Sequence, residues 1–489
     1  MLLKQQRFSG LGFISISGAL LLCLAFLLVA KAPDFLIPVL LLSTLPLAYI
    51  ISRFHWQVPF MKILAFSLPF SLELQIVEGS MLRVPGEPLI VLAAAVFLFK
   101  FISEWRLKRV KLFKEWIWVL PFMAAFAFAI PFSGLLLVSL KFAMVNYVYI
   151  FVFYFFLSIL FSENPKLFPQ MLLLFGAGML LVTFWSVFRF WQLEWNPVVV
   201  RGIFRPFFKD HTIFGASAAL LSAFWFSYAV FSKERLSRLL SLGAGITFLG
   251  IVVFSASRGA FMSIAFFSGL LLLLIMGFRL KHLVILGLAL LIFVLIFREP
   301  IQTRLQRIEA VSYDSEAGLI DRTVSTGNVT TDVSNIERLN RWLSAVRMFR
   351  ERPLTGFGPG TYQFEYIPFQ EPSLMNRLTV TSPWNIPEGS GGTAHSEYLL
   401  ALSEMGIWGL LGFLIILGRW FFVAFNKSHN HLNRRWMLVA FLALSTYIFH
   451  AFFNNFLTTD KFAFLFWGTA AWLISNLHNQ NEENVLPTG

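Results

Sequence analysis

Charged side chains are scarce in this chain of 489 residues, of which 13% are Asp, Glu, Lys or Arg and 57% are hydrophobic. Soluble globular domains carry about twice that charged fraction, roughly 25%. The mean hydropathy is +0.72. The composition therefore excludes an ordinary soluble protein and indicates an all-α membrane protein, a polytopic bundle of apolar helices.

Cysteine is nearly absent, because Cys23 is the single one and no internal disulfide can form. The long connections lack an Asp-x-Asp pair, a His/Cys cluster and a paired-His motif. A metal site is therefore poorly supported, although the scattered carboxylates of Asp314, Asp321, Asp332 and Glu337 keep that alternative open. The short connections contain no P-loop or Rossmann glycine pattern, so we expect neither nucleotide hydrolysis nor a cofactor.

Apolar stretches of about 15–25 residues recur along the chain and predict about fourteen membrane-spanning helices, within a range of roughly 12–14. The first follows Lys4 and Arg7, and we interpret it as an uncleaved span because it is longer than the apolar core of a secretory signal. The expected spans lie near 11–30, 34–51, 60–72, 88–103, 116–132, 138–161, 169–189, 212–231, 239–256, 260–278, 282–297, 406–425, 435–453 and 462–477.

The net charge of +13 could suggest a nucleic-acid partner, so its distribution matters. Basic residues gather before the first span and after even-numbered spans, at 4–7, 53–62, 106–114, 233–238, 279–281 and 427–435. This is the positive-inside pattern, and it predicts that both termini are cytoplasmic. The basic excess is then an orientation signal, and we expect the lipid bilayer and no nucleic acid as a partner.

The same orientation divides the chain into five segments. We expect N-terminal membrane helices at 1–190, further membrane helices with external arginine-bearing loops at 191–298, one large external loop at 299–405, C-terminal membrane helices at 406–477 and a cytoplasmic tail at 478–489. A loop of this length is usually functional or disordered. Residues 334–337 are a capping box, and apolar residues then recur at helical spacing up to Pro353, so we predict short helices inside the loop.

His395 stands where the long loop returns to the apolar chain. One interpretation is a histidine satisfied by hydrogen bonds at a helix start. The other is a general base, because a neutral imidazole can take the proton of a hydroxyl at neutral pH. The sequence does not decide whether Glu397 and Glu404, which follow closely, are partners of this histidine.

Arginines at the expected outer face are candidates for binding an anion. Arg258 lies in a Ser-Arg-Gly turn at a helix start, where it either extends to the membrane interface or holds a phosphate together with backbone N–H groups. Arg201 and Arg205 lie among aromatics, either as a belt on anionic lipid or as a clamp for a lipid-linked pyrophosphate.

Two weaker candidates lie in the long loop. Arg338 and Arg341 are one helical turn apart, which is more often a solvated face than a ligand site. The glycine cluster at 356–360 could form a backbone anion nest but is also consistent with a plain turn.

Several of these stretches together resemble the O-antigen ligase family. His395 and Ser396, nine residues, and then Gly406 and Gly409 are similar to that family's histidine motif. Three more stretches agree, at 201–215, 257–260 and 335–360, so the resemblance covers about 200–460. Met262 stands where the family often has leucine, which is an apolar exchange.

The resemblance implies a metal-independent, inverting glycosyltransferase of the bacterial inner membrane with its active site on the periplasmic face. It implies a glycan linked to undecaprenyl pyrophosphate as the donor and lipid A-core or a growing glycan as the acceptor. His395 would be catalytic, with Arg258 and Arg201 binding the donor pyrophosphate and Arg205 and Arg338 as weaker candidates. No metal and no cofactor would be required.

Other functions stay open on the sequence alone. Within the family, a ligase acting on lipid A-core, a repeat-unit polymerase and a protein O-oligosaccharyltransferase differ only in the acceptor, and we favour the ligase. A transporter or flippase for a lipid-linked glycan is the alternative of another class. It predicts ionisable residues inside several spans, and beyond Lys141, Arg189 and Arg419 few are found.

Overall fold

A computed structural model describes residues 44–54, 56–77, 80–107, 111–196, 199, 202–277, 333–375, 392–426 and 431–485. The chain forms two compact units. Unit 1 comprises residues 1–116, 144–217 and 457–489, and unit 2 comprises residues 117–143 and 218–456. The expected spans at 11–30 and 282–297, and most of the one at 34–51, lie outside the described residues.

Eight helices among the described residues are long and apolar enough to cross a membrane. The prediction of a polytopic helical membrane protein is confirmed in this coarse form, whereas the count of about fourteen is not. The eight spans are Gly86–Arg106, Lys114–Phe132, Leu136–Glu163, Leu167–Gln192, His211–Phe231, Arg235–Ser255, Arg258–Ile275 and Glu397–Phe425. The expected span at 60–72 is a shorter apolar helix, Gln57–Phe70, and the last two expected spans correspond to helices outside these eight.

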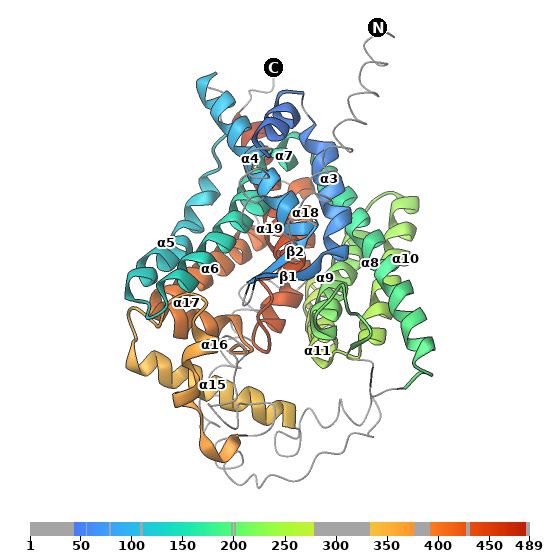
Figure 1. Ribbon diagram of the computed structural model, residues 1–489. Coiled ribbons are helices and arrows are strands. Elements are labelled where there is room, and N and C mark those ends of the chain that lie inside the picture. The colour runs from blue at the N-terminus through green and yellow to red at the C-terminus, as the bar shows by residue number, and fades with distance from the viewer. Residues whose placement is uncertain are drawn as a thin grey trace. The chain divides into compact units, whose positions relative to one another are not determined.

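Unit 1 is a set of apolar helices with one small hairpin, all shown in Figure 1. Strands β1 (Leu72–Val77) and β2 (Ser80–Val84) pair antiparallel, with Leu72 opposite Val84. The sequence analysis predicted helices alone and did not anticipate this hairpin. The helical elements are α3 (Gln57–Ser67), η1 (Leu68–Phe70), α4 (Gly86–Arg106), the π-helical η4 (Ile150–Phe156), α7 (Leu157–Glu163), α8 (Leu167–Gln192) and α19 (Asp460–Val485).

Unit 2 contains the histidine motif and the Ser-Arg-Gly turn. Its helices are α5 (Leu120–Ala129), η3 (Ile130–Phe132), α10 (Arg235–Ser255), α11 (Arg258–Ile275), α15 (Val333–Glu351), α16 (Tyr362–Glu365), η7 (Ile367–Phe369), η8 (Pro372–Leu374), α17 (Glu397–Phe425) and α18 (His431–His450). Three elements, η2 (Lys114–Trp118), α6 (Leu136–Tyr149) and α9 (His211–Phe231), include residues of both units.

The described part of the long loop, residues 333–375 and 392–396, is folded. Its longest helix, α15, is drawn in yellow in Figure 1 and packs against α17. Burial of apolar side chains stabilises this contact. The shared core consists of Ala345, Met348, Phe357, Tyr362, Tyr366, Ala394 and Leu400. Helices are therefore present in the described part of the stretch for which the sequence predicted them.

Helix α17 is interrupted at Gly406, whose backbone has φ 64° and ψ −160°. The segment that follows α15 packs into this interruption, and the Ile407 amide donates to the carbonyl of Pro353 at 2.8 Å. A Cβ at position 406 would lie 2.7 Å from the backbone of Leu354. The glycine of the histidine motif is thus required by a positive φ and by close backbone contact.

Candidate functional site

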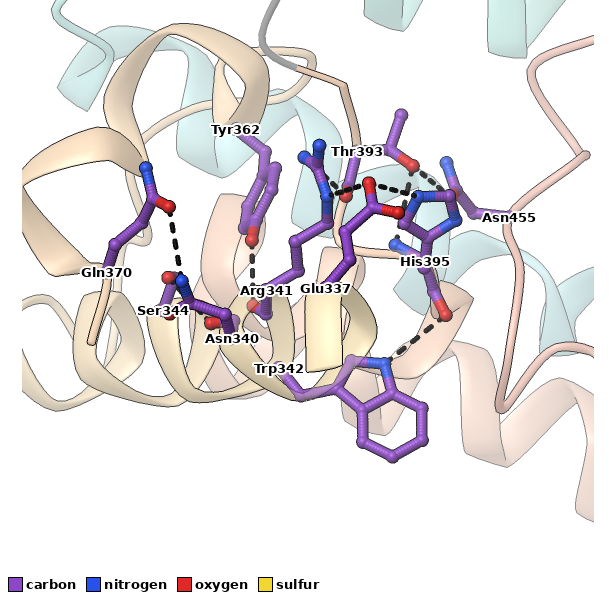
Figure 2. A network of polar contacts seen from close by, with 10 residues as sticks. All are labelled: Glu337, Asn340, Arg341, Trp342, Ser344, Tyr362, Gln370, Thr393, His395 and Asn455. Atoms are coloured by element: carbon purple, nitrogen blue, oxygen red, sulfur yellow. Dashed lines mark hydrogen bonds and ion pairs between the residues drawn. The ribbon is translucent and has the colours of Figure 1, made fainter. Parts of the chain in front are cut away.

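His395 lies immediately before α17, and its backbone is in the left-handed region with φ 49°. Such a conformation is uncommon for a residue with a side chain and is maintained only when the surroundings determine it. Here the Trp342 indole donates to the His395 carbonyl at 3.4 Å, and the Thr393 hydroxyl accepts from the His395 amide at 3.4 Å. Thr393 in turn donates to Asn455 at 2.6 Å, as Figure 2 shows.

Glu337, on α15, is the carboxylate closest to the imidazole in this network. Its Oε1 lies 3.7 Å from Nε2 of His395 and accepts from Nε of Arg341 at 3.0 Å (Figure 2). Burial would raise the pKa of Glu337, but His395 and Arg341 outweigh burial and hold this pKa below its ordinary value. The histidine side chain is 29% exposed, so it has both an anionic partner and an open side.

The residues after His395 are attached to the last turn of α18. Ser396 caps α17 by accepting from the Leu399 amide. The Glu397 amide donates to the carbonyl of Ala451 at 2.9 Å, and its carboxylate accepts from the Tyr447 hydroxyl. Glu397, which the sequence left undecided, is therefore a buried attachment of the motif to α18.

Arg258 is the first residue of α11, in the tight turn that the sequence predicted. Ala256 closes α10 in the left-handed region with φ 50°, and Ser257 caps α11 by accepting from the Ala260 amide at 3.4 Å. Gly259 packs on the buried ring of His450, because a Cβ at 259 would lie 2.9 Å from that ring. His450 ends α18, so the arginine turn and the histidine motif meet the same end of one helix.

The arginines of the other expected anion loop belong to unit 1. Arg201 lies outside the described residues. Arg205 is exposed at the tip of a turn, and its carbonyl accepts from the Arg189 guanidinium at 2.7 Å and from the Trp185 indole at 3.3 Å. Arg258 and the elements around His395 thus belong to the same unit, unit 2. Arg205 belongs to unit 1.

Arg338 lies on α15 beside Glu337 and is half-buried. Its neighbour Arg341 is only 4% exposed, so the expectation of a solvated arginine face is wrong for Arg341. The guanidinium of Arg341 contacts Glu337, the carbonyl of Thr393 at 3.3 Å and the ring of Tyr366 at 5.1 Å. Arg341 therefore holds the carboxylate that faces the histidine.

The amides at the end of the glycine cluster bind a carboxyl group of the chain itself. The carboxylate of Glu404 accepts from the Gly360 amide at 2.8 Å and from the Tyr362 amide at 3.0 Å. These amides are therefore occupied and do not form a site for a substrate anion. Glu404, the second undecided carboxylate, fastens the loop to α17.

Sequence reasoning did not name His450 or Asn455, and it assigned neither Trp342 nor Glu337 a contact with His395. Glu337 was interpreted as part of a capping box, whereas its carboxylate is directed at Arg341 and His395. The spacing of Glu337 and Arg341, one helical turn apart, was the available signal. Among the described residues, no group of three or more His, Cys, Asp or Glu is arranged to hold a metal.

Comparison with known proteins finds a family likeness for these elements. No curated protein matches the chain. The family model described as O-antigen ligase matches residues 243–414, which include the arginine turn, α15, the glycine cluster and the histidine motif. The match supports a membrane glycosyltransferase of the ligase or polymerase type in general. Residues 243–414 of the chain are thus similar to the O-antigen ligase family.

Proposed function

We propose that this protein transfers a glycan from undecaprenyl pyrophosphate to an acceptor hydroxyl at the periplasmic face, with lipid A-core as the acceptor. Donor, acceptor and membrane side are those that the family resemblance implies. The observation that carries the proposal is the pairing of His395 with the Glu337 carboxylate, beside a helix end that also carries the Arg258 turn.

In this proposal His395 is the general base. Its imidazole accepts the proton of the acceptor hydroxyl while the hydroxyl oxygen forms a bond to the anomeric carbon of the donor. The bond between that carbon and the pyrophosphate oxygen breaks, and the lipid pyrophosphate leaves with the electron pair. Because attack and departure occur on opposite faces of the carbon, the configuration inverts. Glu337 orients the ring and stabilises the imidazolium that forms.

Arginines would stabilise the negative charge that collects on the leaving pyrophosphate. A guanidinium offers a fixed fork of donors to phosphate oxygens and needs no metal. We assign this role to Arg258 and Arg201, with Arg205 and Arg338 as further candidates. Arg258 is the best supported of the four, because its helix packs on α18 beside the attachment of the histidine motif.

The test is reconstitution of the purified protein with an undecaprenyl-pyrophosphate glycan in the presence of EDTA. One reaction receives lipid A-core and the other receives no added acceptor. We expect glycan on lipid A-core, with a loss of about 10²–10⁴ in rate for His395→Ala, the usual contribution of general base catalysis. His478→Ala is the matched control, because that histidine packs against the ring of Phe113 in unit 1.

The same reactions separate the alternatives. A ladder of lengthening donor-linked chains without added acceptor would identify a repeat-unit polymerase. Transfer only after a protein acceptor is supplied would identify an oligosaccharyltransferase. Movement of the intact donor across the membrane without transfer would support the transporter. Full activity of folded His395→Ala would show that the base is assigned to the wrong residue.

A further inference from the structure

A lysine is buried at the start of α19 in unit 1. Lys461 is 6% exposed, and its ammonium donates to the carbonyl of Ser71 at 2.8 Å and to the carbonyl of Phe207. The same group lies 4.5 Å from the ring centre of Phe208. Burying an ammonium is unfavourable unless hydrogen bonds and nearby charge compensate it. The side chain therefore ties three distant parts of the chain together at some energetic cost.

Nearby acidic groups supply the compensating charge. Asp460 is 1% exposed and lies close enough to Lys461 and Arg83 for its negative charge to act on both. Arg83 also pairs with Glu73 at 3.2 Å and with Glu87 at 3.4 Å, which ties the β-hairpin to α4. Lys461 is thus part of a group of charged side chains that links α19 to the hairpin. It also contacts the loop of residues 202–209, which carries Arg205.

The loop that Lys461 contacts presents a cation outward. Phe204 and Phe208 are buried and pack on Phe214, whereas Arg205 and Lys209 are exposed. Inside the turn, the Arg205 amide donates to the Gly202 carbonyl and the Phe208 amide donates to the Phe204 carbonyl. Lys461 binds this turn two residues after Arg205. Fixing the backbone there restricts where the Arg205 guanidinium can lie.

We propose that Lys461 is a positioning residue that holds the 202–209 loop so that Arg205 binds the pyrophosphate of the lipid-linked donor. The proposal rests on the proposed function. A preorganised loop binds an anion more tightly because less motion is lost on binding. The alternative is that Lys461 only stabilises the fold, in which case its effect does not depend on Arg205.

The experiment compares the wild type, Lys461→Met, Arg205→Ala and the double variant as full-length proteins in nanodiscs of neutral lipid. The probe is undecaprenyl pyrophosphate, with undecaprenol as the uncharged control. We expect about tenfold weaker pyrophosphate binding in Lys461→Met, the order expected from freeing one to two ordered side chains. Undecaprenol binding should not change. Lys166→Met, an exposed lysine of the same unit, should bind as the wild type.

The double variant distinguishes positioning from general stabilisation. If Lys461 acts through Arg205, the double variant binds no more weakly than Arg205→Ala, whereas independent effects would add. Hydrogen exchange provides a second readout, and the amides of Arg205 and Phe208 should exchange faster in Lys461→Met. If that variant does not fold, Lys461→Gln retains an N–H donor on a shorter side chain and permits the same comparison.

Three outcomes would overturn the proposal. The first is an unchanged rate of hydrogen exchange in residues 202–209 of Lys461→Met. The second is a double variant whose loss of binding equals the sum of the two single losses. The third is phosphatidylglycerol competing for the loop as well as undecaprenyl pyrophosphate does, which would mean that the loop binds bulk anionic lipid. Binding and exchange need no turnover. The proposed function can therefore fail in the transfer assay, with no product formed, while this result still supports or contradicts the role of Lys461.

Discussion

The two units hold their candidate residues in opposite ways. In unit 2, the His395 ring faces the Glu337 carboxylate at 3.7 Å, so the reacting group itself has a partner. In unit 1, the backbone of the Arg205 loop is held, with Arg189 on the carbonyl of Arg205 and Lys461 on that of Phe207. The hydrogen bond of the Arg205 side chain to the Lys209 carbonyl is long, at 3.4 Å.

This difference follows from what each group would have to do. A general base benefits from a carboxylate on its ring, because the carboxylate stabilises the charge that the ring acquires. An arginine that binds a leaving pyrophosphate must keep its donors available, and a strong carboxylate partner would compete for them. Hydrogen bonds to the main chain fix the position of such an arginine and leave its guanidinium donors available. The variants below change one side of this comparison at a time.

After His395→Ala, the largest effect is expected at Arg258, in the turn that packs on the end of α18. Arg258→Ala should lower transfer by about 10²–10³, the loss seen when one preorganised charge contact is removed. Arg258→Lys should recover only part of it, because lysine keeps the charge but loses the two-pronged donor geometry. Transfer rates in the reconstituted assay measure both. Arg350→Ala, an exposed arginine at the end of α15, is the control, and an equal loss there would contradict a specific role for Arg258.

Glu337→Gln removes the negative charge that faces the imidazole and retains most of the shape. We expect transfer to fall by about 10–100-fold in kcat with little change in donor KM, less than the ~10⁴ of a fully buried triad carboxylate. The reduction is smaller because the Glu337 side chain is 14% exposed and lies 3.7 Å from the ring.

The control for this variant is Glu371→Gln, a carboxylate of the same folded loop that pairs with Arg347. It should leave kcat unchanged. If Glu337→Gln changes donor KM and leaves kcat intact, this carboxylate contributes to donor binding and not to the action of the base.

Much of this arrangement could be predicted from the sequence, since hydropathy and caps are local signals. Apolar length predicted most of the described spans, the Ser-Arg-Gly sequence predicted a turn where α11 begins, and a helix start was one interpretation of the position of His395. Gly406 entered only through the family resemblance, so its backbone conformation and the segment that fills the interruption of α17 were not among these predictions. These predictions succeeded because each depends on residues close together in the chain.

The remaining features depend on long-range contacts. Glu337 is 58 positions from His395, and Lys461 is 254 positions from Phe207 and 390 from Ser71. No periodicity predicts which carbonyl a buried lysine will meet. The hairpin β1–β2 was missed because its strands lie between two apolar helices, where a short strand and the end of a span have similar composition. Arg341 was misjudged because its burial depends on Tyr366 and Thr393, which follow it in the chain.

A smaller effect is expected at Trp342, whose indole bonds to the backbone carbonyl of His395 and not to the imidazole. Trp342→Phe removes the indole donor to the His395 carbonyl, a long hydrogen bond of 3.4 Å. We expect transfer to fall by about threefold, the low end of what one neutral hydrogen bond contributes. Trp408→Phe, an exposed tryptophan of α17, is the control. A loss as large as that of Glu337→Gln would mean that backbone strain at His395 matters as much as its carboxylate.

The smallest effect is on stability, and its dependence on pH has a definite sign. Since the folded pKa of Glu337 is lowered from its ordinary value of 4.5, its ionised form stabilises the fold. This contribution is fully present above pH 4.5 and is lost as the pH falls through the lowered folded value. It should amount to less than about 1 kcal/mol, because the pair is partly exposed to solvent.

Thermal unfolding of the wild type and Glu337→Gln, followed by tryptophan fluorescence between pH 7 and pH 3, measures this term. The difference in Tm should be constant above about pH 5 and should shrink below it, because only the wild type has a carboxylate to protonate at this position. A difference that stays constant down to pH 3 would mean that Glu337 carries no charge interaction with His395 and Arg341. The ring of His395 would then be held by its backbone alone, as the Arg205 loop is, and the contrast between the two units would disappear.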